Sequence, residues 1–180
     1  MPDNRASKRE RTPLSPEDLV ARAKARELNR EIAECASKKD ASRAIEAFNA
    51  VKESGWCNQH TYSSMINTYI RCGLLVEAEA TFKELVESKK VKPDVVTCTT
   101  MLKGYQSVGD IAKCIQLMEM MEQARPAILP NIRTVNTFLR CCLLTGEIGH
   151  AENLLAKVKD MKDVEPDMST WEYMVALLCQ

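Results

Sequence analysis

Apolar residues recur along most of the chain at the spacing of amphipathic helices. The clearest stretch has apolar positions three or four residues apart: Ile132, Val135, Phe138, Leu139, Cys142 and Leu143, then Ile148, Ala151, Leu154, Leu155 and Val158. This spacing places the apolar side chains on one face of a helix. The segment from 132 to 158 therefore predicts two amphipathic helices joined by a turn at Gly146.

The same pattern occurs three times, because three segments of the chain align with one another. Each segment has Thr in its second position, Gly twelve residues later and a small residue five residues after that Gly: Thr61, Gly73 and Ala78; Thr97, Gly109 and Cys114; Thr134, Gly146 and Ala151. The glycines recur at intervals of 36 and 37 residues. An internal repeat of this length is typical of a solenoid, in which similar units stack in a row.

Each repeat carries signals for the ends of its two helices. The Gly allows the positive φ that closes the first helix, and the small residue lets the two helix backbones approach. A proline then stops the second helix in three similar elements: Lys92-Pro93-Asp94, Leu129-Pro130-Asn131 and Glu165-Pro166-Asp167. One repeat is therefore a helical hairpin that buries its apolar face only by stacking on its neighbours.

The repeats divide the chain into segments with these expected boundaries: a disordered, mildly basic tail at 1–14, a degenerate first repeat at 15–58, repeats at 59–94, 95–131 and 132–167, and a partial repeat or capping helix at 168–180. In the first repeat Lys38-Lys39-Asp40 replaces the Gly turn, and Asp40 is a candidate N-cap. Ser15-Pro16-Glu17-Asp18 matches a capping box with Pro at the first helical position, so the first helix is expected to begin there.

Composition supports helices, and the net charge gives no evidence of a polyanionic partner. Of 180 residues, 45% are hydrophobic, 28% are charged and 5% are aromatic, and the residue types that favour helices are plentiful. The 25 Lys and Arg residues balance the 25 Asp and Glu residues. A nucleic-acid partner must therefore be argued from the arrangement of side chains rather than from net charge.

The sequence contains no evident membrane span or targeting segment. Apolar runs such as Val175–Cys179 are far shorter than the roughly 18 to 20 residues that cross a bilayer, so no membrane partner is expected. Met1–Arg5 lack the apolar stretch of a secretory signal, and Glu10, Glu17 and Asp18 do not fit the acid-poor composition of an organellar transit peptide. These features predict a cytoplasmic protein or a shortened chain.

Few residues are arranged for catalysis or for binding a metal ion. His60 and His150 lie in no recognisable nucleophile or metal motif, and Cys57 with His60 lacks the second ligand pair of a zinc site. The eight cysteines are interpreted as reduced residues of the core. We expect Cys142 in the core and Cys141 exposed, rather than a redox switch. No enzyme activity, cofactor, metal or small-molecule substrate is expected.

The repeat resembles that of the pentatricopeptide repeat family. Thr61-Tyr62-Ser63-Ser64-Met65-Ile66, with Lys92-Pro93-Asp94 closing the unit, matches the family's Thr-Tyr-rich first helix and Pro-Asp ending. The tetratricopeptide repeat, the nearest alternative, has Gly and large aromatic residues inside its first helix and lacks the Pro-Asp ending. The resemblance covers roughly residues 25–180. It implies an all-α, right-handed solenoid of stacked helical hairpins.

The resemblance also implies a function and the residues that carry it. Helical-repeat proteins of this kind read single-stranded RNA with two or three side chains per base. The base-reading positions of the family correspond here to four pairs: Asn29 with Asn58, Ser63 with Asp94, Thr99 with Asn131, and Asn136 with Asp167. The positions that sandwich the base correspond to Arg26, His60, Val96 and Arg133. By the family's pairing preferences, the implied RNA address is pyrimidine-G-A-U.

Three alternatives stay open at this stage. Asp94, Asn131 and Asp167 precede helices, where N-caps are common, although capping does not account for the small polar residues at 63, 99 and 136. A solenoid surface also suits a protein partner, which makes the chain an interaction scaffold. The chain also fits the substrate-binding part of a larger RNA-processing enzyme. By resemblance, the RNA reader acts in RNA processing, stability or translation in a mitochondrion or plastid.

Overall fold

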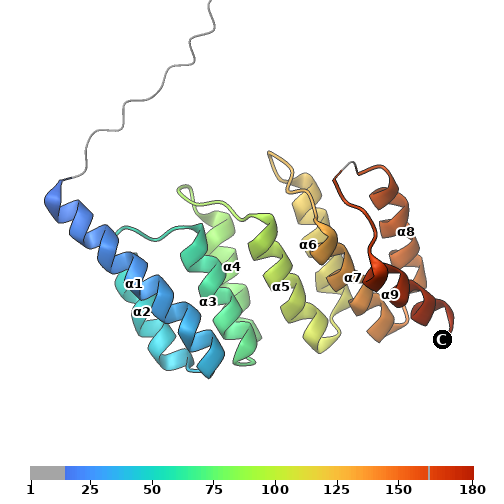
Figure 1. The fold of residues 1–180 in the computed structure, drawn as a ribbon, viewed down its shortest axis with the longest axis horizontal. Coiled ribbons are helices and arrows are strands. Elements are labelled where there is room, and N and C mark those ends of the chain that lie inside the picture. Colours follow the sequence, from blue (N-terminus) through green and yellow to red (C-terminus); the bar gives the residue numbers. More distant parts are fainter. Residues whose placement is uncertain (1–14, 162) are drawn as a thin grey trace, which may run out of the picture.

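The computed structural model describes residues 15–161 and 163–180, and within them the chain forms nine α-helices and no strand. The helices are α1 (Pro16–Lys38), α2 (Ala41–Glu53), α3 (Gln59–Arg71), α4 (Leu75–Glu87), α5 (Val95–Val108), α6 (Ile111–Gln123), α7 (Ile132–Thr145), α8 (Ile148–Lys159) and α9 (Met168–Leu178). Figure 1 shows a row of helical hairpins with α1 at one end and α9 at the other. The predicted all-α solenoid is confirmed. The expected tail at 1–14 lies outside the described residues, and the boundaries of the repeats stay a prediction.

Two kinds of helix alternate along the row. The first helices (α1, α3, α5, α7 and α9) each pack against the next first helix, so they form one continuous layer. The second helices (α2, α4, α6 and α8) pack against their own first helix and the following one, and they stand farther apart from one another, joined within the described residues by ion pairs between long side chains: Lys52–Glu84, Lys113–Glu79 and Lys157–Glu122. The more closely spaced layer of first helices therefore lies on the inner side of the curved stack.

Helix starts in the first repeat follow the polar residues that the sequence places there. Oγ of Ser15 accepts a hydrogen bond from the backbone N–H of Asp18 at 3.1 Å, and Pro16 occupies the first position of α1. Oδ1 of Asp40 accepts from the backbone N–H of Arg43 at 3.1 Å at the start of α2. Both predicted N-caps are confirmed, and each satisfies an N–H group that has no partner inside its helix.

Residues in the left-handed conformation close the first helices. Gly109 and Gly146 end α5 and α7 with φ of 69° and 74°, and Gly73 follows α3 with φ of 77°. In the first repeat, Lys39 takes the same conformation at the end of α1, with φ of 56°. The predicted turns are confirmed, including the lysine turn that replaces glycine.

Replacing Gly146 by alanine is expected to lower the free energy of unfolding by about 1 kcal/mol, because a Cβ atom opposes positive φ. Gly149 in α8 is a matched control, since its φ is not left-handed and a Cβ there would meet nothing within 4 Å. Gly149→Ala is expected to raise the free energy of unfolding by a few tenths of a kcal/mol. Urea unfolding followed by circular dichroism measures both, and equal effects at the two sites would contradict the turn assignment.

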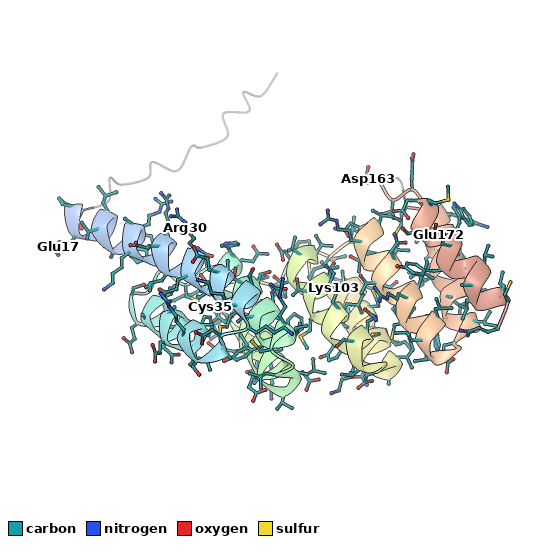
Figure 2. The ribbon with its side chains drawn as sticks, turned by 60° about the horizontal axis from the view of Figure 1, so that its bottom comes forward. Glu17, Arg30, Cys35, Lys103, Asp163 and Glu172 are labelled. Atoms are coloured by element: carbon teal, nitrogen blue, oxygen red, sulfur yellow. The ribbon has the colours of Figure 1, made fainter. Side chains whose placement is uncertain are left out.

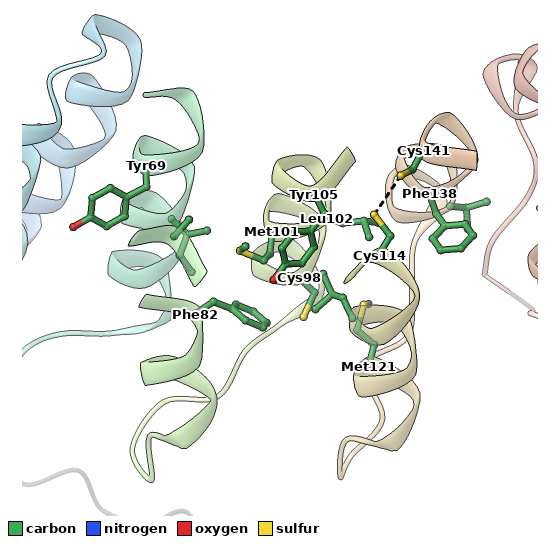
Figure 3. Close-up of a cluster of buried hydrophobic side chains, with 14 of the residues drawn as sticks. Tyr69, Phe82, Cys98, Met101, Leu102, Tyr105, Cys114, Met121, Phe138 and Cys141 are labelled. Atoms are coloured by element: carbon green, nitrogen blue, oxygen red, sulfur yellow. Dashed lines mark hydrogen bonds between the residues drawn. The ribbon is translucent and has the colours of Figure 1, made fainter. Parts of the chain in front are cut away.

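The core continues from unit to unit between the two layers of helices. Figure 3 shows its central part, where Phe82 of α4, Tyr105 of α5 and Phe138 of α7 lie among smaller apolar side chains. The fourth residue of every second helix is small and fully buried: Ala44, Ala78, Cys114 and Ala151. The predicted role of these residues, to allow a close approach of the two helices in a hairpin, fits their complete burial.

Cys141 is buried, and the expectation that it is exposed is wrong. Its Sγ lies 3.5 Å from Sγ of Cys114 on α6 (Figure 3). The reason is that each interior first helix is covered both by its own second helix and by the preceding unit. Thr68 in α3 and Gly104 in α5 are equivalent to Cys141, and they also face the preceding unit. The hydroxyl of Thr68 donates to the carbonyl of Ile32 in α1 at 3.2 Å, and a Cβ on Gly104 would lie 2.9 Å from Leu75 of α4.

All eight cysteines are free thiols, and five of them are buried. The expectation that the cysteines belong to the core is therefore confirmed for these five, whereas Cys57 and Cys72 are half-buried and Cys179 is exposed. Burial raises the pKa of Cys98 and of Cys142 to about 12, so both thiols are protonated at neutral pH and are poor nucleophiles. These residues therefore serve as small apolar side chains of the core.

Candidate functional site

The starts of the first helices bring predicted base-reading residues together. The N-cap residue of a first helix lies beside the second turn of the preceding first helix, because these helices stack side by side. The fourth pair shows this directly: Nδ2 of Asn136 in α7 donates to Oδ1 of Asp167, the N-cap of α9, at 2.9 Å. The hydroxyl of Thr170 donates to Oδ1 of Asn136 at 2.7 Å. Asn136 and Asp167 therefore form one polar site.

The third pair is connected through a threonine. Oγ1 of Thr99 in α5 lies 2.7 Å from Oγ1 of Thr134, which in turn lies 3.1 Å from Oδ1 of Asn131, the N-cap of α7. Thr99 is buried, with 6% of its surface exposed, and its hydroxyl is 2.6 Å from the carbonyl oxygen of Val95. The half-buried side chain of Asn131 is therefore the more accessible member of this pair.

No hydrogen bond joins the members of the other two pairs within the described residues. Ser63 in α3 is half-buried, and Oδ1 of Asp94 accepts from the backbone N–H and the hydroxyl of Thr97 at 2.8 and 2.7 Å. Asn58 is exposed at the start of α3. Asn29 is buried in α1, and its Oδ1 has no hydrogen-bond partner among the described residues. Asn29 is therefore, like Thr99, a predicted base-reading residue whose side chain is buried.

The capping role of the N-cap residues is confirmed. Asn58, Asp94, Asn131 and Asp167 each accept a hydrogen bond from the backbone N–H of the Thr three residues later. Capping uses only Oδ1 of each side chain. The second terminal atom, Oδ2 of the aspartates and Nδ2 of the asparagines, makes no hydrogen bond within the part of the chain that the structure describes. Capping and ligand contact therefore use different atoms and do not exclude each other.

The four candidate stacking residues all face solvent. They are Arg26, His60, Val96 and Arg133. Each lies three residues before the reading residue of its first helix, about one helical turn away, and therefore on the same face. Their exposure leaves them free to contact a base, and the stacking role itself stays a prediction.

Four threonines position the N-cap residues, a role that the sequence pattern did not reveal. They are the third residues of the first helices α3, α5, α7 and α9, all fully buried: Thr61, Thr97, Thr134 and Thr170. The hydroxyl of each contacts Oδ1 of its N-cap residue. Thr61, Thr97 and Thr134 recur in the sequence repeat, but their contact with the N-cap residue becomes apparent only in the structure.

Charge is segregated between the two layers although the chain as a whole is neutral. The first helices α3, α5 and α7 contain no Asp or Glu and carry four cations: Arg71, Lys103, Arg133 and Arg140. The second helices α4, α6 and α8 contain seven Glu and four Lys. The central part of the inner layer is therefore positive, a feature that net charge conceals.

Lys103 and Arg140 are functional candidates that the sequence analysis missed. They occupy equivalent positions in α5 and α7, four residues after Thr99 and Asn136 respectively. Each therefore lies on the same face of its helix as the predicted base-reading residue. Both are exposed, and neither forms an ion pair within the described residues. Lys103 lies midway along the row of helices (Figure 2). A search for cations one turn beyond each reading position would have found both.

Other kinds of site find no support in the described part of the chain. It contains no group of three or more His, Cys, Asp or Glu side chains placed to hold a metal ion. His60 is exposed and Cys57 is half-buried, with no further ligand beside them. Among the described helices, none has the length and apolar character required to cross a membrane.

A family model described as "Pentacotripeptide-repeat region of PRORP" matches residues 19–178. The chain belongs to the pentatricopeptide repeat family. Similar family members from Arabidopsis thaliana include the mitochondrial protein At5g09450, 29% identical over 99 residues, and the chloroplastic protein DOT4, 32% identical over 91 residues. These matches cover 55% and 51% of this chain but 24% and 9% of the relatives. The chain therefore spans less than a quarter of the length of either.

Solved structures of pentatricopeptide repeat proteins share the fold. PPR10, a maize protein solved in complex with an 18-nt psaJ RNA element, gives a TM-score of 0.70 at 24% identity, over 84% of this chain and 22% of that chain. The pentatricopeptide repeat domain of Arabidopsis thaliana protein-only RNase P 1, solved in complex with tRNA, gives 0.70 at 18% identity, over 87% of this chain and 81% of that chain. These structures show the same fold, and the family model confirms the family resemblance found in the sequence.

Proposed function

We propose that this chain binds single-stranded RNA along the layer of first helices, with one base held per unit and without catalysis. The observation that carries the proposal is the site formed by Asn136 and Asp167, whose unused atoms match the edge of one base. The positive charge of α3, α5 and α7 supports an anionic ligand. The RNA bound in the two similar solved structures supports the choice of RNA.

Asn136 and Asp167 offer a hydrogen-bond donor beside an acceptor. One N–H of Asn136 Nδ2 is used by Asp167 and the other is available, as is Oδ2 of Asp167. Uracil has an N3–H donor flanked by carbonyl acceptors, so Asp167 can accept from N3–H while Asn136 donates to a carbonyl. The hydrogen bonds from Asn136 and from the backbone of Thr170 hold the pKa of Asp167 below its ordinary value. The acceptor is therefore a carboxylate at neutral pH, and the fourth unit suits uracil.

The preceding units suit purines by the same reasoning. Both N–H groups of Asn131 Nδ2 are available to donate to N1 of adenine, where guanine has a donor instead. Oδ2 of Asp94 is available to accept from the N1–H and N2–H groups of guanine. With a pyrimidine assigned to Asn29 and Asn58 by family preference, the proposed address is pyrimidine-G-A-U from the 5′ end.

Lys103 and Arg140 are proposed to bind the phosphates between these bases. They occupy equivalent positions in neighbouring units, so they can follow an RNA backbone that advances by one nucleotide per unit. Neither cation is neutralised by a described carboxylate. Electrostatic attraction of this kind supplies much of the affinity for single strands and depends on salt.

Relatives favour an organellar setting for this RNA binding. Two of them are named as mitochondrial and chloroplastic, which supports a role in RNA processing, stability or translation in an organelle. The family model is named for PRORP, which favours, as a second candidate function, the RNA-binding part of a larger RNA-processing enzyme. A protein partner on the same layer is the remaining alternative.

The salt dependence of RNA binding tests the proposal. A labelled single-stranded RNA that contains the proposed address is expected to bind with micromolar or weaker affinity, since four bases contribute about 1–3 kcal/mol each against several kcal/mol of association cost. Neutralisation of two phosphates by Lys103 and Arg140 predicts a slope of about −1.4 in a plot of log K against log salt concentration. Fluorescence anisotropy measures the slope. A slope near zero, or no binding at low salt, would contradict RNA binding and favour a protein partner.

A further inference from the structure

Two buried thiols meet where the α5–α6 hairpin packs against the α7–α8 hairpin. Cys114 lies in α6 and Cys141 lies in α7, 27 positions later in the sequence. Their Sγ atoms are 3.5 Å apart, with the thiol of Cys114 donating to Sγ of Cys141 (Figure 3). Both side chains are fully buried. The contact therefore joins two neighbouring hairpins and not the two helices of one hairpin.

Equivalent positions at the other junctions between hairpins carry no cysteine. Counted from the N-cap residues, the equivalent pairs are Ala44 with Thr68, Ala78 with Gly104, and Ala151 with Leu177. All six residues are buried, so these positions belong to the packing between hairpins in each case. Residues without sulfur fill them at three junctions, which shows that stacking does not require a thiol. The two cysteines thus add a chemical property to one junction.

A small local movement is enough to join the two sulfur atoms. A disulfide bond has a length of about 2.05 Å, so the distance between Sγ of Cys114 and Sγ of Cys141 must shorten by about 1.5 Å. Rotation of the two side chains about χ1, with a slight shift of α6 towards α7, provides this movement. Among the described residues, no other two cysteine thiols form a hydrogen bond with each other.

A hollow beside the pair offers a small oxidant a route from solvent. It has a volume of about 480 Å³ and lies between α6 and α8. Its lining includes Ile115, the residue after Cys114, and Phe138, which precedes Cys141 by about one helical turn. Exposed Glu122 also lines the hollow, which connects it to solvent. Since repeat units contact only their neighbours, local opening of this one junction completes the access.

Hydrogen peroxide oxidises such a pair with a complete balance of atoms and electrons. Burial raises the pKa of both thiols, and the hydrogen bond from Cys114 offsets part of this rise at Cys141. Cys141 therefore ionises first, although slowly at neutral pH. Its thiolate attacks one peroxide oxygen and the O–O bond breaks. The departing hydroxide takes up the proton that Cys141 released, which leaves a sulfenic acid at Cys141 and one water molecule.

The second thiol completes the reaction. Sγ of Cys114 attacks the sulfenic sulfur of Cys141, the S–O bond breaks, and the departing hydroxide takes up the thiol proton of Cys114 as a second water molecule. Overall, two thiols and one hydrogen peroxide give one disulfide and two water molecules. The two sulfur atoms are oxidised and the peroxide is reduced.

We propose that Cys114 and Cys141 are the site of a peroxide-driven disulfide that locks the α5–α6 hairpin to the α7–α8 hairpin. The bond closes the chain between residues 114 and 141 and thereby restricts the unfolded state. It also restrains the two hairpins whose first helices hold Thr99 and Asn131, the third pair of predicted base-reading residues. The proposal rests on the fold and does not depend on RNA binding.

The test uses the full chain with its accessible thiols removed. Cys57, Cys72 and Cys179 are half-buried or exposed, and replacing them by serine leaves the five buried cysteines. This parent chain, shown to be folded by circular dichroism, is incubated overnight with excess hydrogen peroxide. Mass spectrometry after alkylation in denaturant is expected to show two fewer free thiols and a cross-link between Cys114 and Cys141 that dithiothreitol reverses. The midpoint of thermal unfolding is expected to rise by about 5 °C.

Cys114→Ala is the matched variant, because alanine occupies the equivalent position in α2, α4 and α8. It is expected to fold and to show neither the cross-link nor the rise in midpoint. Cys142→Ala removes the buried thiol next to the pair and is expected to behave like the parent chain. No cross-link in the parent chain, a cross-link through another cysteine, or an equal rise in midpoint in Cys114→Ala would overturn the proposal.

Discussion

Reversing the charges of Lys103 and Arg140 is expected to weaken RNA binding by about 30- to 100-fold at moderate salt. The double variant Lys103→Glu, Arg140→Glu removes two attractions to phosphate and adds two repulsions, each worth on the order of 1 kcal/mol or less in a solvated setting. Folding is expected to be little affected, because both side chains are exposed and form no described ion pair. Anisotropy titrations with the address RNA measure the loss, and circular dichroism checks the fold.

Cations of the second helices provide the matched control. Lys83 in α4 and Lys159 in α8 are exposed, and Lys83→Glu with Lys159→Glu makes the same change in net charge away from the first-helix layer. RNA affinity is expected to change by about twofold or less, since charges beyond about 10 Å are screened at this ionic strength. An equal loss in both double variants would show that net charge, and not the inner layer, governs binding.

The fold was predictable because several local signals agree. Helical periodicity, Gly73, Gly109 and Gly146 at the ends of the first helices, and Pro-containing elements after the second helices all indicate the same hairpin. In the first repeat the turn has Lys39 instead of glycine, and it was still predictable because Asp40 marks the start of the next helix. These features depend on residues that are close in sequence, and sequence patterns report such features well.

Features that depend on packing between units were less accessible to sequence reasoning. Exposure of Cys141 was expected because the side chains of adjacent residues in one helix diverge and Cys142 was assigned to the core, whereas the stack covers α7 from two sides. Burial of Thr99 and Asn29 likewise depends on the neighbouring unit. The contact between Asn136 and Asp167 joins residues 31 positions apart, and only the family resemblance paired them. Spacing alone could not show that one atom of each N-cap residue is left for a ligand.

Exchanging the third reading pair for the fourth is expected to reverse a base preference. The double variant Thr99→Asn, Asn131→Asp places Asn beside Asp with Thr134 next to both, which reproduces the contacts of Asn136, Asp167 and Thr170. Adenine is expected to be preferred by about fivefold over uracil at the third base in the original chain, and uracil over adenine by about fivefold in the variant. This swing assumes about 1 kcal/mol per mismatch, the lower end for base readout in DNA sites.

The substitution at the N-cap preserves the start of α7, and circular dichroism checks that the larger side chain of Asn is accommodated at the buried position 99. Asp is as good an N-cap as Asn, so α7 is expected to change in stability by only a few tenths of a kcal/mol. The reciprocal variant Asn136→Thr, Asp167→Asn is the control for direction, and it is expected to move the preference at the fourth base from uracil towards adenine. A change in overall affinity without a change in preference would indicate a general effect on RNA binding rather than on base selection.

The most direct measurement of base reading is the ratio of two dissociation constants, for RNAs that differ only by A or U at the third base of the address. The ratio is measured by anisotropy at one salt concentration for the original chain and for Thr99→Asn, Asn131→Asp. Base reading by the reading pairs predicts that the ratio inverts, from about fivefold in favour of A to about fivefold in favour of U. The same ratio in both proteins, with RNA binding retained, would show that these residues cap helices and do not select the base.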